Sequence, residues 1–330
     1  MSRRLSLGLV LAAVLAFLVV ASSGGAAGPP PPKAANGNSV EVAGTGVPTP
    51  TAFAFTGTTV FAGSGPSEKG GPGGLFTLAD GKASKVPKTP PVVFGLAWHE
   101  DQLYVSTGKT IVAYSGWNGT AFSGSKLIYA NKTKGFPGLN GLAFAPNGRL
   151  YAGLALNQKY DSAKDPFPLS QGVVSMTAAG KGLKFVARGL RQPWQLVFPE
   201  GSAHPYVTDL AQDKGKAPRD QIVVAKPGQN YGFPTCVWTV LKDCKGYSKP
   251  KIFLPPHSSP MGIGAIGKTL YVALFNGTGK GPEVVTIPTA GGKPKPFLTK
   301  FAAPIVGLGI DQGNVYVGDL TGTIYKVAAK

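Results

Sequence analysis

The chain is poor in the residues from which most catalytic and metal centres are built. Its 330 residues include 2 cysteines, 3 histidines and 15 acidic residues, against 33 basic residues. It has no phosphate-cradling glycine loop, no HExxH zinc motif and no convincing serine or cysteine nucleophile phrase. After residue 30, no segment resembles a long amphipathic helix. Any catalytic or metal site must therefore use some other arrangement of residues. The fold must be built mainly from β-strands.

Only the N-terminus has a long apolar run. It extends from Leu5 to about Ala21, follows two arginines and precedes the small residues of 22–28. These are the parts of a secretory signal peptide, so we predict a signal peptide at 1–27. The alternative is an uncleaved anchor, since the run is just long enough to cross a bilayer. After cleavage the chain would have no membrane-spanning segment. We therefore expect the protein to be secreted or held in the cell envelope.

The residues after the apolar run predict a tether and then one large domain. Residues 28–39 include four consecutive prolines and read as an extended Pro/Gly-rich linker. The 47 glycines and 30 prolines of the chain fall mainly between apolar strands, where they mark turns. We therefore predict that residues 40–330 fold as a single β domain.

The charge of the chain is strongly positive. Its formal net charge is +18, and loss of Arg3 and Arg4 with the signal peptide would leave +16. The lysines are scattered over turns and strand edges, which argues against a dedicated nucleic-acid module. A solvated surface, attraction to an acidic envelope and an anionic ligand all remain open as explanations.

The two cysteines, Cys236 and Cys244, are close in sequence within a loop rich in lysine and glycine. In an exported protein this spacing predicts one structural disulfide. Metal binding would need further ligands such as histidine, and none lies between them.

A short phrase returns six times along the chain. It consists of a small or turn residue, an apolar strand, a turn, and a second strand built around Tyr-Val or a close variant. The copies start roughly 40 to 65 residues apart, which is the period of propeller blades with loops of variable length. They begin at Ala52, Gly95, Gly141, Gln195, Gly262 and Gly307. Because paired strands cannot bury an apolar face alone, we predict an all-β, six-bladed β-propeller, closed by pairing strands from the two ends of the domain.

The segment from Arg188 to Pro234 carries the most polar groups that could bind a ligand. The guanidinium of Arg191, with the amides of Gln192, Gln195 and Asn230, could hold a carboxylate by paired hydrogen bonds. The alternative is structural: Arg191 satisfies carbonyls between blades, and Asn230-Tyr-Gly forms a tight turn. Spacing alone does not decide between the two.

The same segment resembles the soluble quinoprotein glucose/sorbosone dehydrogenase family. The resemblance is carried by Gly189-Leu-Arg-Gln-Pro, Asp220-Gln-Ile, Gly228-Gln-Asn-Tyr-Gly-Phe-Pro, His257-Ser-Ser-Pro-Met-Gly-Ile and the closing Asp319-Leu-Thr-Gly-Thr-Ile-Tyr-Lys. It spans about Phe94 to Val327. It implies a six-bladed propeller that holds pyrroloquinoline quinone (PQQ) and calcium over its axis and oxidises a sugar hydroxyl, with a histidine as base. Arg191 matches the family's cofactor-contacting arginine, Gln192 replaces its usual asparagine, and Lys280 is the candidate for a second cation.

Two departures from the family pattern concern the catalytic machinery. Pro137 stands where the family has its catalytic histidine, and proline cannot accept a proton. The usual Asp-Glu-Ile-Asn is Asp220-Gln-Ile-Val, which loses a carboxylate. Asp209 and Asp220 are the candidate calcium ligands because hard cations take oxygen ligands, although solvated loop carboxylates are the alternative.

His257 is the candidate substitute base. His99 and His204 fall in turns where surface exposure is expected, whereas His257 precedes the first strand of the fifth repeat and should face the axis. A hydrogen bond that caps the Ser-Ser-Pro turn is the alternative role. Phe167 and Trp194 could stack on a sugar or cofactor ring, or simply pack between blades.

Two functions follow. One is a PQQ- and calcium-dependent dehydrogenase of a sugar or alcohol, with Arg191, Gln192, Asn230 and Lys280 at the cofactor, Asp209 and Asp220 at the metal, and His257 as base. The other is a non-catalytic propeller that binds a carbohydrate, envelope component or protein through its axial funnel. A calcium-dependent lactonase-type hydrolase would need converging acidic ligands that the sequence does not identify.

Overall fold

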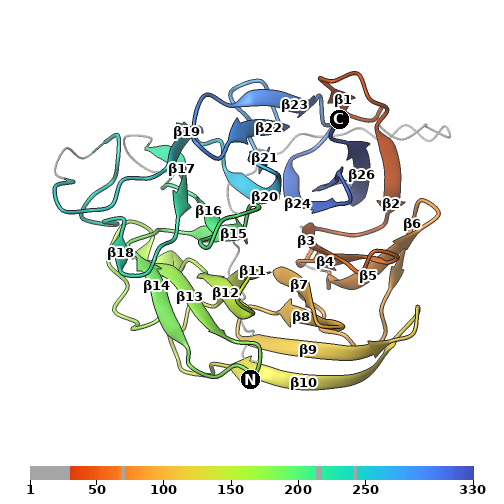
Figure 1. Cartoon of the computed structure of the whole chain (residues 1–330), viewed down its shortest axis with the longest axis horizontal. Helices are drawn as coiled ribbons and strands as arrows, with labels where there is room; N and C mark the ends of the chain where they lie inside the picture. The colour runs from red at the N-terminus through yellow and green to blue at the C-terminus, as the bar shows by residue number, and fades with distance from the viewer. Residues whose placement is uncertain (1–29, 68–70, 213–217, 241–243) are drawn as a thin grey trace, which may run out of the picture. The chain divides into compact units, whose positions relative to one another are not determined.

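Six sheets, antiparallel except where β18 pairs parallel with β14, surround a central axis like the blades of a propeller (Figure 1), as the repeats predict. The computed structural model describes residues 30–67, 71–212, 218–240 and 244–330. The predicted signal peptide, 1–27, lies outside these residues. In the described part of the chain, the longest helical element is the 3-10 turn η1 (Gln158–Tyr160), and no helix is long and apolar enough to cross a membrane.

Each of the first three blades places its strands in chain order from the axis outward. Blade one contains β3 (Pro50–Phe55), β4 (Val60–Ser64), β5 (Gly74–Ala79) and β6 (Lys82–Lys85). Blade two contains β7 (Gly95–His99), β8 (Gln102–Ser106), β9 (Thr110–Trp117) and β10 (Phe122–Ala130). Blade three contains β11 (Leu139–Phe144), β12 (Arg149–Leu154), β13 (Gly172–Thr177), β14 (Lys184–Arg188) and, at its outer edge, β18 (Gln229–Asn230).

Blades five and six each include a strand from the N-terminal part of the chain, whereas blade four uses successive strands except β18, which joins blade three. Blade four contains β15 (Pro193–Val197), β16 (Tyr206–Asp209), β17 (Arg219–Val224) and β19 (Ile252–Pro256). Blade five contains β20 (Pro260–Ile266), β21 (Thr269–Leu274), β22 (Glu283–Pro288), β23 (Lys295–Thr299) and β1 (Lys33–Ala34). Blade six contains β24 (Ile305–Asp311), β25 (Asn314–Asp319), β26 (Thr323–Ala328) and β2 (Glu41–Thr45).

The ring closes through blade six, as predicted. The N-terminal strand β2 pairs antiparallel with the C-terminal strand β26, with Glu41 opposite Lys326 and Thr45 opposite Thr323. The folded unit begins earlier than the predicted linker boundary, at Pro31. Residues Lys33–Ala34, expected in a free tether, pair with β23 because their extended backbone can hydrogen-bond to its open edge.

Apolar packing lies between the blades rather than within them. Six buried clusters are present in the described residues, and each joins two neighbouring sheets. One, for example, combines Phe61 and Leu75 of blade one with Leu96 and Leu103 of blade two. A single blade therefore has no closed core of its own, and the ring is the unit that buries the apolar faces.

Glycine at the start of the innermost strands allows neighbouring blades to meet backbone to backbone. A Cβ on Gly95 would lie 2.6 Å from the carbonyl oxygen of Asn140, and one on Gly262 would lie 2.6 Å from the amide nitrogen of Leu308. Real Cβ atoms do not approach backbone this closely. The glycine that begins four of the six copies in the sequence is thus a requirement of close packing around the axis.

We predict that Gly262→Ala destabilises the protein by roughly 1–3 kcal/mol, because the new methyl group overpacks rigid backbone. Gly65→Ala is the matched control: its Cβ would meet side-chain atoms at ordinary contact distances, the nearest being Thr51 Cγ2, at 3.4 Å, and Thr49 Cγ2, at 3.7 Å. Urea unfolding of the two variants measures the difference. Equal stability of the two variants would contradict the packing argument.

Candidate functional site

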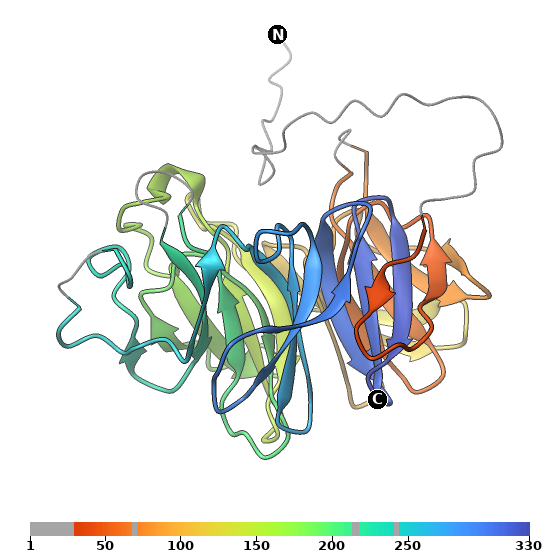
Figure 2. The same cartoon turned by 90° about the horizontal axis from the view of Figure 1, so that it is seen from above.

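The six innermost strands all start at one axial face of the ring, which we call the start face; the opposite one is the end face. In Figure 2 the ring lies edge-on, with η1 on the start face and the C-terminus on the end face. Because neighbouring strands are antiparallel, the start face also carries the loops between the second and third strands of each blade. It holds most of the predicted site residues, namely Arg191, Gln192, Asp209, Asp220, His257 and Lys280.

Asp209 ends β16 and is the most deeply buried of the candidate ligands, at 1% exposure. Its Oδ1 accepts a hydrogen bond from the Gln192 amide at 2.7 Å, and its Oδ2 accepts from Gln221 Nε2 at 2.8 Å and from the Arg191 amide at 3.4 Å. Burial raises the pKa of Asp209 to about 6, although these hydrogen bonds and the Arg191 charge oppose the rise. The carboxylate therefore fixes the turn that leads into β15.

Asp220, at the start of β17, holds a different turn. Its Oδ1 accepts from the Ala211 amide at 2.7 Å, while its Oδ2 accepts from Ser258 Oγ at 3.0 Å and from the Ser259 amide at 2.8 Å. Asp220 precedes Gln221, the cross-strand neighbour of Asp209, and successive strand residues point to opposite faces of a sheet. The structure thus places the two predicted calcium ligands on opposite faces of blade four.

Arg191 is 6% exposed and extensively bonded within the protein. Its Nη2 pairs with Asp161 Oδ1, its Nε donates to the Asp161 carbonyl at 3.2 Å, and its Nη1 donates to the Leu210 carbonyl at 3.0 Å. A further contact at 3.4 Å reaches Gln192 Oε1. The guanidinium therefore ties the loop after η1 to the loop after β16. No spacing pattern in the sequence indicated Asp161 as its partner, since the two residues are thirty positions apart.

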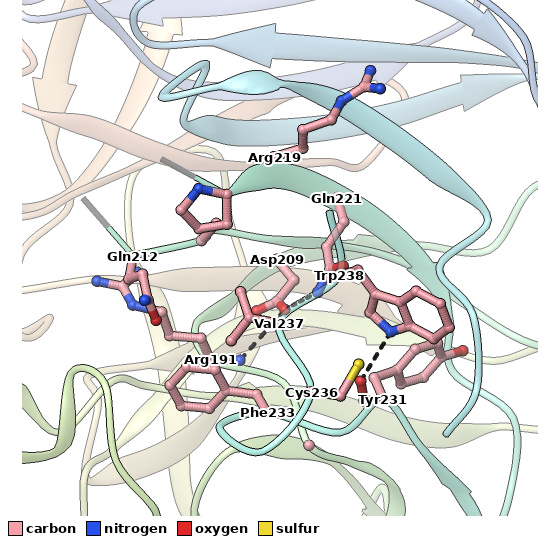
Figure 3. A pocket seen from close by; sticks show the side chains of 13 residues that line it. Arg191, Asp209, Gln212, Arg219, Gln221, Tyr231, Phe233, Cys236, Val237 and Trp238 are labelled. Atoms are coloured by element: carbon pink, nitrogen blue, oxygen red, sulfur yellow. Dashed lines mark hydrogen bonds between the residues drawn. The ribbon is translucent and has the colours of Figure 1, made fainter. Parts of the chain in front are cut away.

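A small pocket opens beside these residues, over blade four (Figure 3). Asp209 lies within it between Arg191 and Gln221, and Tyr231, Cys236 and Trp238 form another part of its wall. Its volume is about 330 Å³ including the open mouth, but only about 20 Å³ can hold the centre of a water molecule. That is room for about one water, so the pocket in this form does not admit a sugar or a quinone.

The side chain of Gln195 extends across the axis of the ring and bridges other blades. It occupies the position that is glycine in four of the other repeats, and its Nε2 donates to the carbonyls of Thr51, at 3.2 Å, and Phe94, at 3.1 Å. Thr51 belongs to blade one, and Phe94 belongs to the turn before blade two. The side-chain amide of Gln195, from blade four, therefore links three parts of the ring. A Cβ on Gly141 would collide with Gln195 Oε1, so the neighbouring glycine leaves the room for this side chain.

Two aromatic rings meet in the same region. Phe94 and Trp194 pack edge to face with their centroids 6.5 Å apart, although they come from blades two and four. Trp194 is 5% exposed, and its Nε1 has no hydrogen-bond partner among the described protein groups. Phe167 instead packs against Phe136, at 5.7 Å, in the loops of blades two and three.

His257 is exposed in the tight turn between β19 and β20. Its backbone is left-handed, with φ of 57°, as is that of Ser259, with φ of 50°. Asp220 binds the turn from blade four, and Asn276 Nδ2 donates to the His257 carbonyl at 2.9 Å from blade five. A strained turn held from both sides positions the imidazole on the start face.

The remaining candidates lie apart from one another. Lys280 is exposed in the loop between β21 and β22, and Pro137 is half-buried in the loop before β11. Asn230 is at the outer edge of blade three, in β18, where its Oδ1 accepts from the Gly232 amide at 3.0 Å. Of the predicted ligand-binding residues, only Arg191 and Asp209 line the pocket.

The predicted disulfide between Cys236 and Cys244 is confirmed. It closes a loop in the segment between β17 and β19, and Cys236 is 2% exposed. His99, expected in an exposed turn, is instead half-buried and stacked on Phe144 with centroids 3.9 Å apart. His204 is half-buried in the turn before β16.

Solved structures with the same architecture include sugar-oxidising enzymes. A PQQ-bound aldose sugar dehydrogenase from Streptomyces coelicolor matches with a TM-score of 0.70 and 18% identity, over 90% of this chain and 99% of that one. The fold is that of the soluble sugar dehydrogenases. A putative glucose dehydrogenase from Thermus thermophilus matches with a TM-score of 0.72 and 18% identity, over 88% and 100% of the two chains.

A third structure extends this similarity. A carbohydrate-active enzyme of family AA12 from Trichoderma reesei matches with a TM-score of 0.74 and 15% identity, over 94% of this chain and 100% of that one. No protein-family profile and no curated protein sequence matches the chain. The resemblance to quinoprotein glucose/sorbosone dehydrogenases inferred from the motifs is thus confirmed at the level of the fold.

Asp209 predicts a pH dependence of stability. Its folded-state pKa of about 6 lies above the usual 3.8, so the folded protein retains a proton that the unfolded chain releases. The stability from this proton is fully present below about pH 4 and is lost as pH rises through about 6, at up to about 1.4 kcal/mol per pH unit. Asp209→Asn should remove this component. The free energy of unfolding of both proteins, measured from pH 4 to 7, tests it; a constant difference between them would contradict the assignment.

Proposed function

We propose that this chain is a sugar-dehydrogenase-like propeller that binds PQQ at its start face and oxidises a hydroxyl of a sugar or alcohol. The observation that carries the proposal is the shared fold with the PQQ-bound aldose sugar dehydrogenase, which extends over 90% of the chain.

The start face offers several groups suited to this cofactor. Phe94 is a partly exposed aromatic ring near the axis and packs edge to face on the buried Trp194, whose Nε1 donor has no partner among the described protein groups. Lys280 is an exposed cation that can pair with a cofactor carboxylate. Arg191 and Gln192 support this surface indirectly. Most of the Arg191 guanidinium already bonds Asp161 and Leu210, so its main contribution is to position the loops. Asn230 takes no part in this arrangement, because it lies at the outer edge of blade three.

When bound, PQQ supplies an acceptor for the hydride that leaves the substrate carbon. His257 takes the hydroxyl proton, and the substrate is left as a carbonyl compound. His257 suits this role because its exposed imidazole lies on the start face, and Asp220 and Asn276 fix the turn that carries it. Asp220 is thus a positioning residue for the base.

The predicted calcium ligands do not fit one calcium ion. Asp209 and Asp220 lie on opposite faces of blade four, and their oxygens already accept hydrogen bonds from the protein. Within the described ranges, no three acidic, histidine or cysteine side chains gather into a metal cluster. The two carboxylates therefore support the turns of the start face and do not form a calcium site together.

We also propose that the protein works outside the cytoplasm, secreted or in the cell envelope. Its disulfide supports this because disulfides persist in oxidising compartments. The N-terminal apolar run supports it independently.

The second candidate function is a non-catalytic propeller that binds a carbohydrate, an envelope component or a protein. Two observations favour it: Pro137 occupies the position of the family's base, and Gln195 closes the axis. Binding of PQQ and turnover of a sugar discriminate between the candidates.

We expect PQQ to quench the tryptophan fluorescence of the full chain on binding, in the presence or absence of calcium. Lys280→Gln should weaken binding by about 10- to 100-fold, because a charge-assisted hydrogen bond is lost. Lys268→Gln, on the end face, is the control and should bind as the wild type does. No binding at tens of micromolar, about −6 kcal/mol or weaker, would overturn the quinoprotein function and leave the binding propeller.

We expect His257→Asn to lower kcat for sugar oxidation with an artificial electron acceptor by about 10²–10⁴-fold. Asparagine tolerates the left-handed backbone of this turn but cannot accept the proton. The affinity for PQQ should not change, and His204→Asn, on the end face, should retain full turnover. Undiminished kcat in His257→Asn would exclude it as the base.

A further inference from the structure

Asparagine followed by glycine occurs five times in the chain, at Asn36, Asn118, Asn140, Asn147 and Asn276. In this dipeptide the glycine amide nitrogen can attack the side-chain carbon Cγ of the asparagine, because glycine has no Cβ to hinder the approach. The reaction needs a glycine N–H that is free, a side-chain Nδ2 that can leave, and donors for the charge that develops on Oδ1. The five dipeptides differ in these groups.

The side-chain nitrogen of three of these asparagines is bound to another part of the protein. In each case Nδ2 donates to a backbone carbonyl of another segment, at 3.2, 2.8 and 2.9 Å in chain order. The three are Asn36, Asn140 and Asn276, of which Asn140 is also buried. The departing group is therefore tied to the fold at these positions, and the side chain is held in place.

The other two asparagines, Asn118 and Asn147, are exposed, and neither Nδ2 donates a hydrogen bond to the described residues. They differ in the glycine that follows. The Gly148 amide donates to the Ala145 carbonyl at 2.9 Å, whereas the Gly119 amide donates to no described protein group. A Cβ on Gly119 would also meet no atom within 4 Å beyond its chain neighbours. The nucleophile is thus engaged at Asn147 and free at Asn118.

The tip of the hairpin between β9 and β10 also supplies donors to Asn118 Oδ1. This oxygen accepts hydrogen bonds from the Thr120 amide at 3.0 Å, from Thr120 Oγ1 at 3.0 Å and from the Ala121 amide at 2.9 Å. When the Gly119 nitrogen bonds to Cγ, negative charge moves onto Oδ1. Donors that already point at this oxygen stabilise that charge without reorganising.

We propose that Asn118 is a modification site at which the fold promotes spontaneous deamidation, with water as the only co-reactant. The Gly119 nitrogen loses its proton to water or hydroxide and bonds to Cγ of Asn118. The Cγ–Nδ2 bond then breaks, and Nδ2 takes up a proton and leaves as ammonia. Water opens the five-membered imide at either carbonyl, which gives aspartate or isoaspartate without any oxidant or reductant.

The product carries a new carboxylate at the end face. The hairpin lies there because the third strand of each blade runs from the start face to the end face. The inference does not rest on the proposed function, since it uses no residue of the start face.

The test measures the rate of deamidation at each of the five dipeptides in the purified full chain. The folded protein is held at mildly alkaline pH, where an amide loses its proton more readily, and peptide mapping by mass spectrometry follows each asparagine. We expect Asn118 to react at least about tenfold faster than Asn147, which corresponds to about 1.4 kcal/mol in the barrier. Comparable rates at Asn118 and Asn147, or no conversion of Asn118, would overturn the proposal.

Unfolding the chain in concentrated urea supplies the matched control. Asn276-Gly-Thr repeats the three residues that begin at Asn118, and an aromatic residue precedes each copy. We expect the two copies to react at similar rates in urea, because the local sequence is the same, and only Asn118 to react readily in the folded protein. If Asn118 keeps its lead over Asn276 in urea, the selectivity comes from the local sequence and the proposal fails.

Thr120→Val tests the donors to Oδ1. The substitution removes one donor and keeps the branched shape of the side chain, so we expect the folded protein to deamidate at Asn118 about three- to tenfold more slowly. Circular dichroism verifies that the variant folds. A faster reaction would mean that these hydrogen bonds restrain the amide, and would overturn the role given to the fold.

Discussion

The close approach of neighbouring innermost strands around the axis is the constraint on which the rest of the structure depends. Glycines such as Gly95 and Gly262 allow backbone to meet backbone, and the apolar faces of adjacent blades then close against each other. The space that the small residues leave at the centre is narrow enough for one side chain, Gln195, to bridge carbonyls of other blades. Gln195 and the packing glycines occupy the same position of the repeat. The polar bridge at the centre and the apolar packing further out therefore both depend on that position.

The same architecture explains why carboxylates on the start face have structural roles. Loops that cross from one blade to the next expose backbone amides that the sheets cannot satisfy, and buried side chains must accept those hydrogen bonds. Asp209 and Asp220 do so on the two faces of blade four, and thereby set the turns that carry Arg191 and His257. Groups that could act as ligands in isolation are thus committed to holding the surface on which a ligand would bind.

The architecture was readable from the sequence because it depends on local, repeated features. Apolar alternation, turn residues and the recurring Tyr-Val located the first two strands of every blade, and the spacing of the copies gave their number. The contacts of the candidate site were harder to predict from the sequence. Asp161 lies thirty residues from Arg191, and Gln195 reaches carbonyls more than a hundred residues away, so neither contact leaves a short-range signal. Strand β18 also crosses to blade three from within blade four, which moved Asn230 away from the axis where the motif had suggested it.

The pairing of β2 with β26 has a consequence for how the protein acquires its structure. The outermost strand of blade six, β2, is made before the strands of all six innermost positions, and its partner β26 is made after the other five blades. Those five blades can assemble their strands as the chain emerges, but the sixth must wait for residues 323–328. The closing contact is therefore of very high sequence separation, which makes it slow to form. Until it forms, strand β2 and the open edge of blade six can pair with other chains, so this contact also ends the period in which the protein is most prone to aggregate.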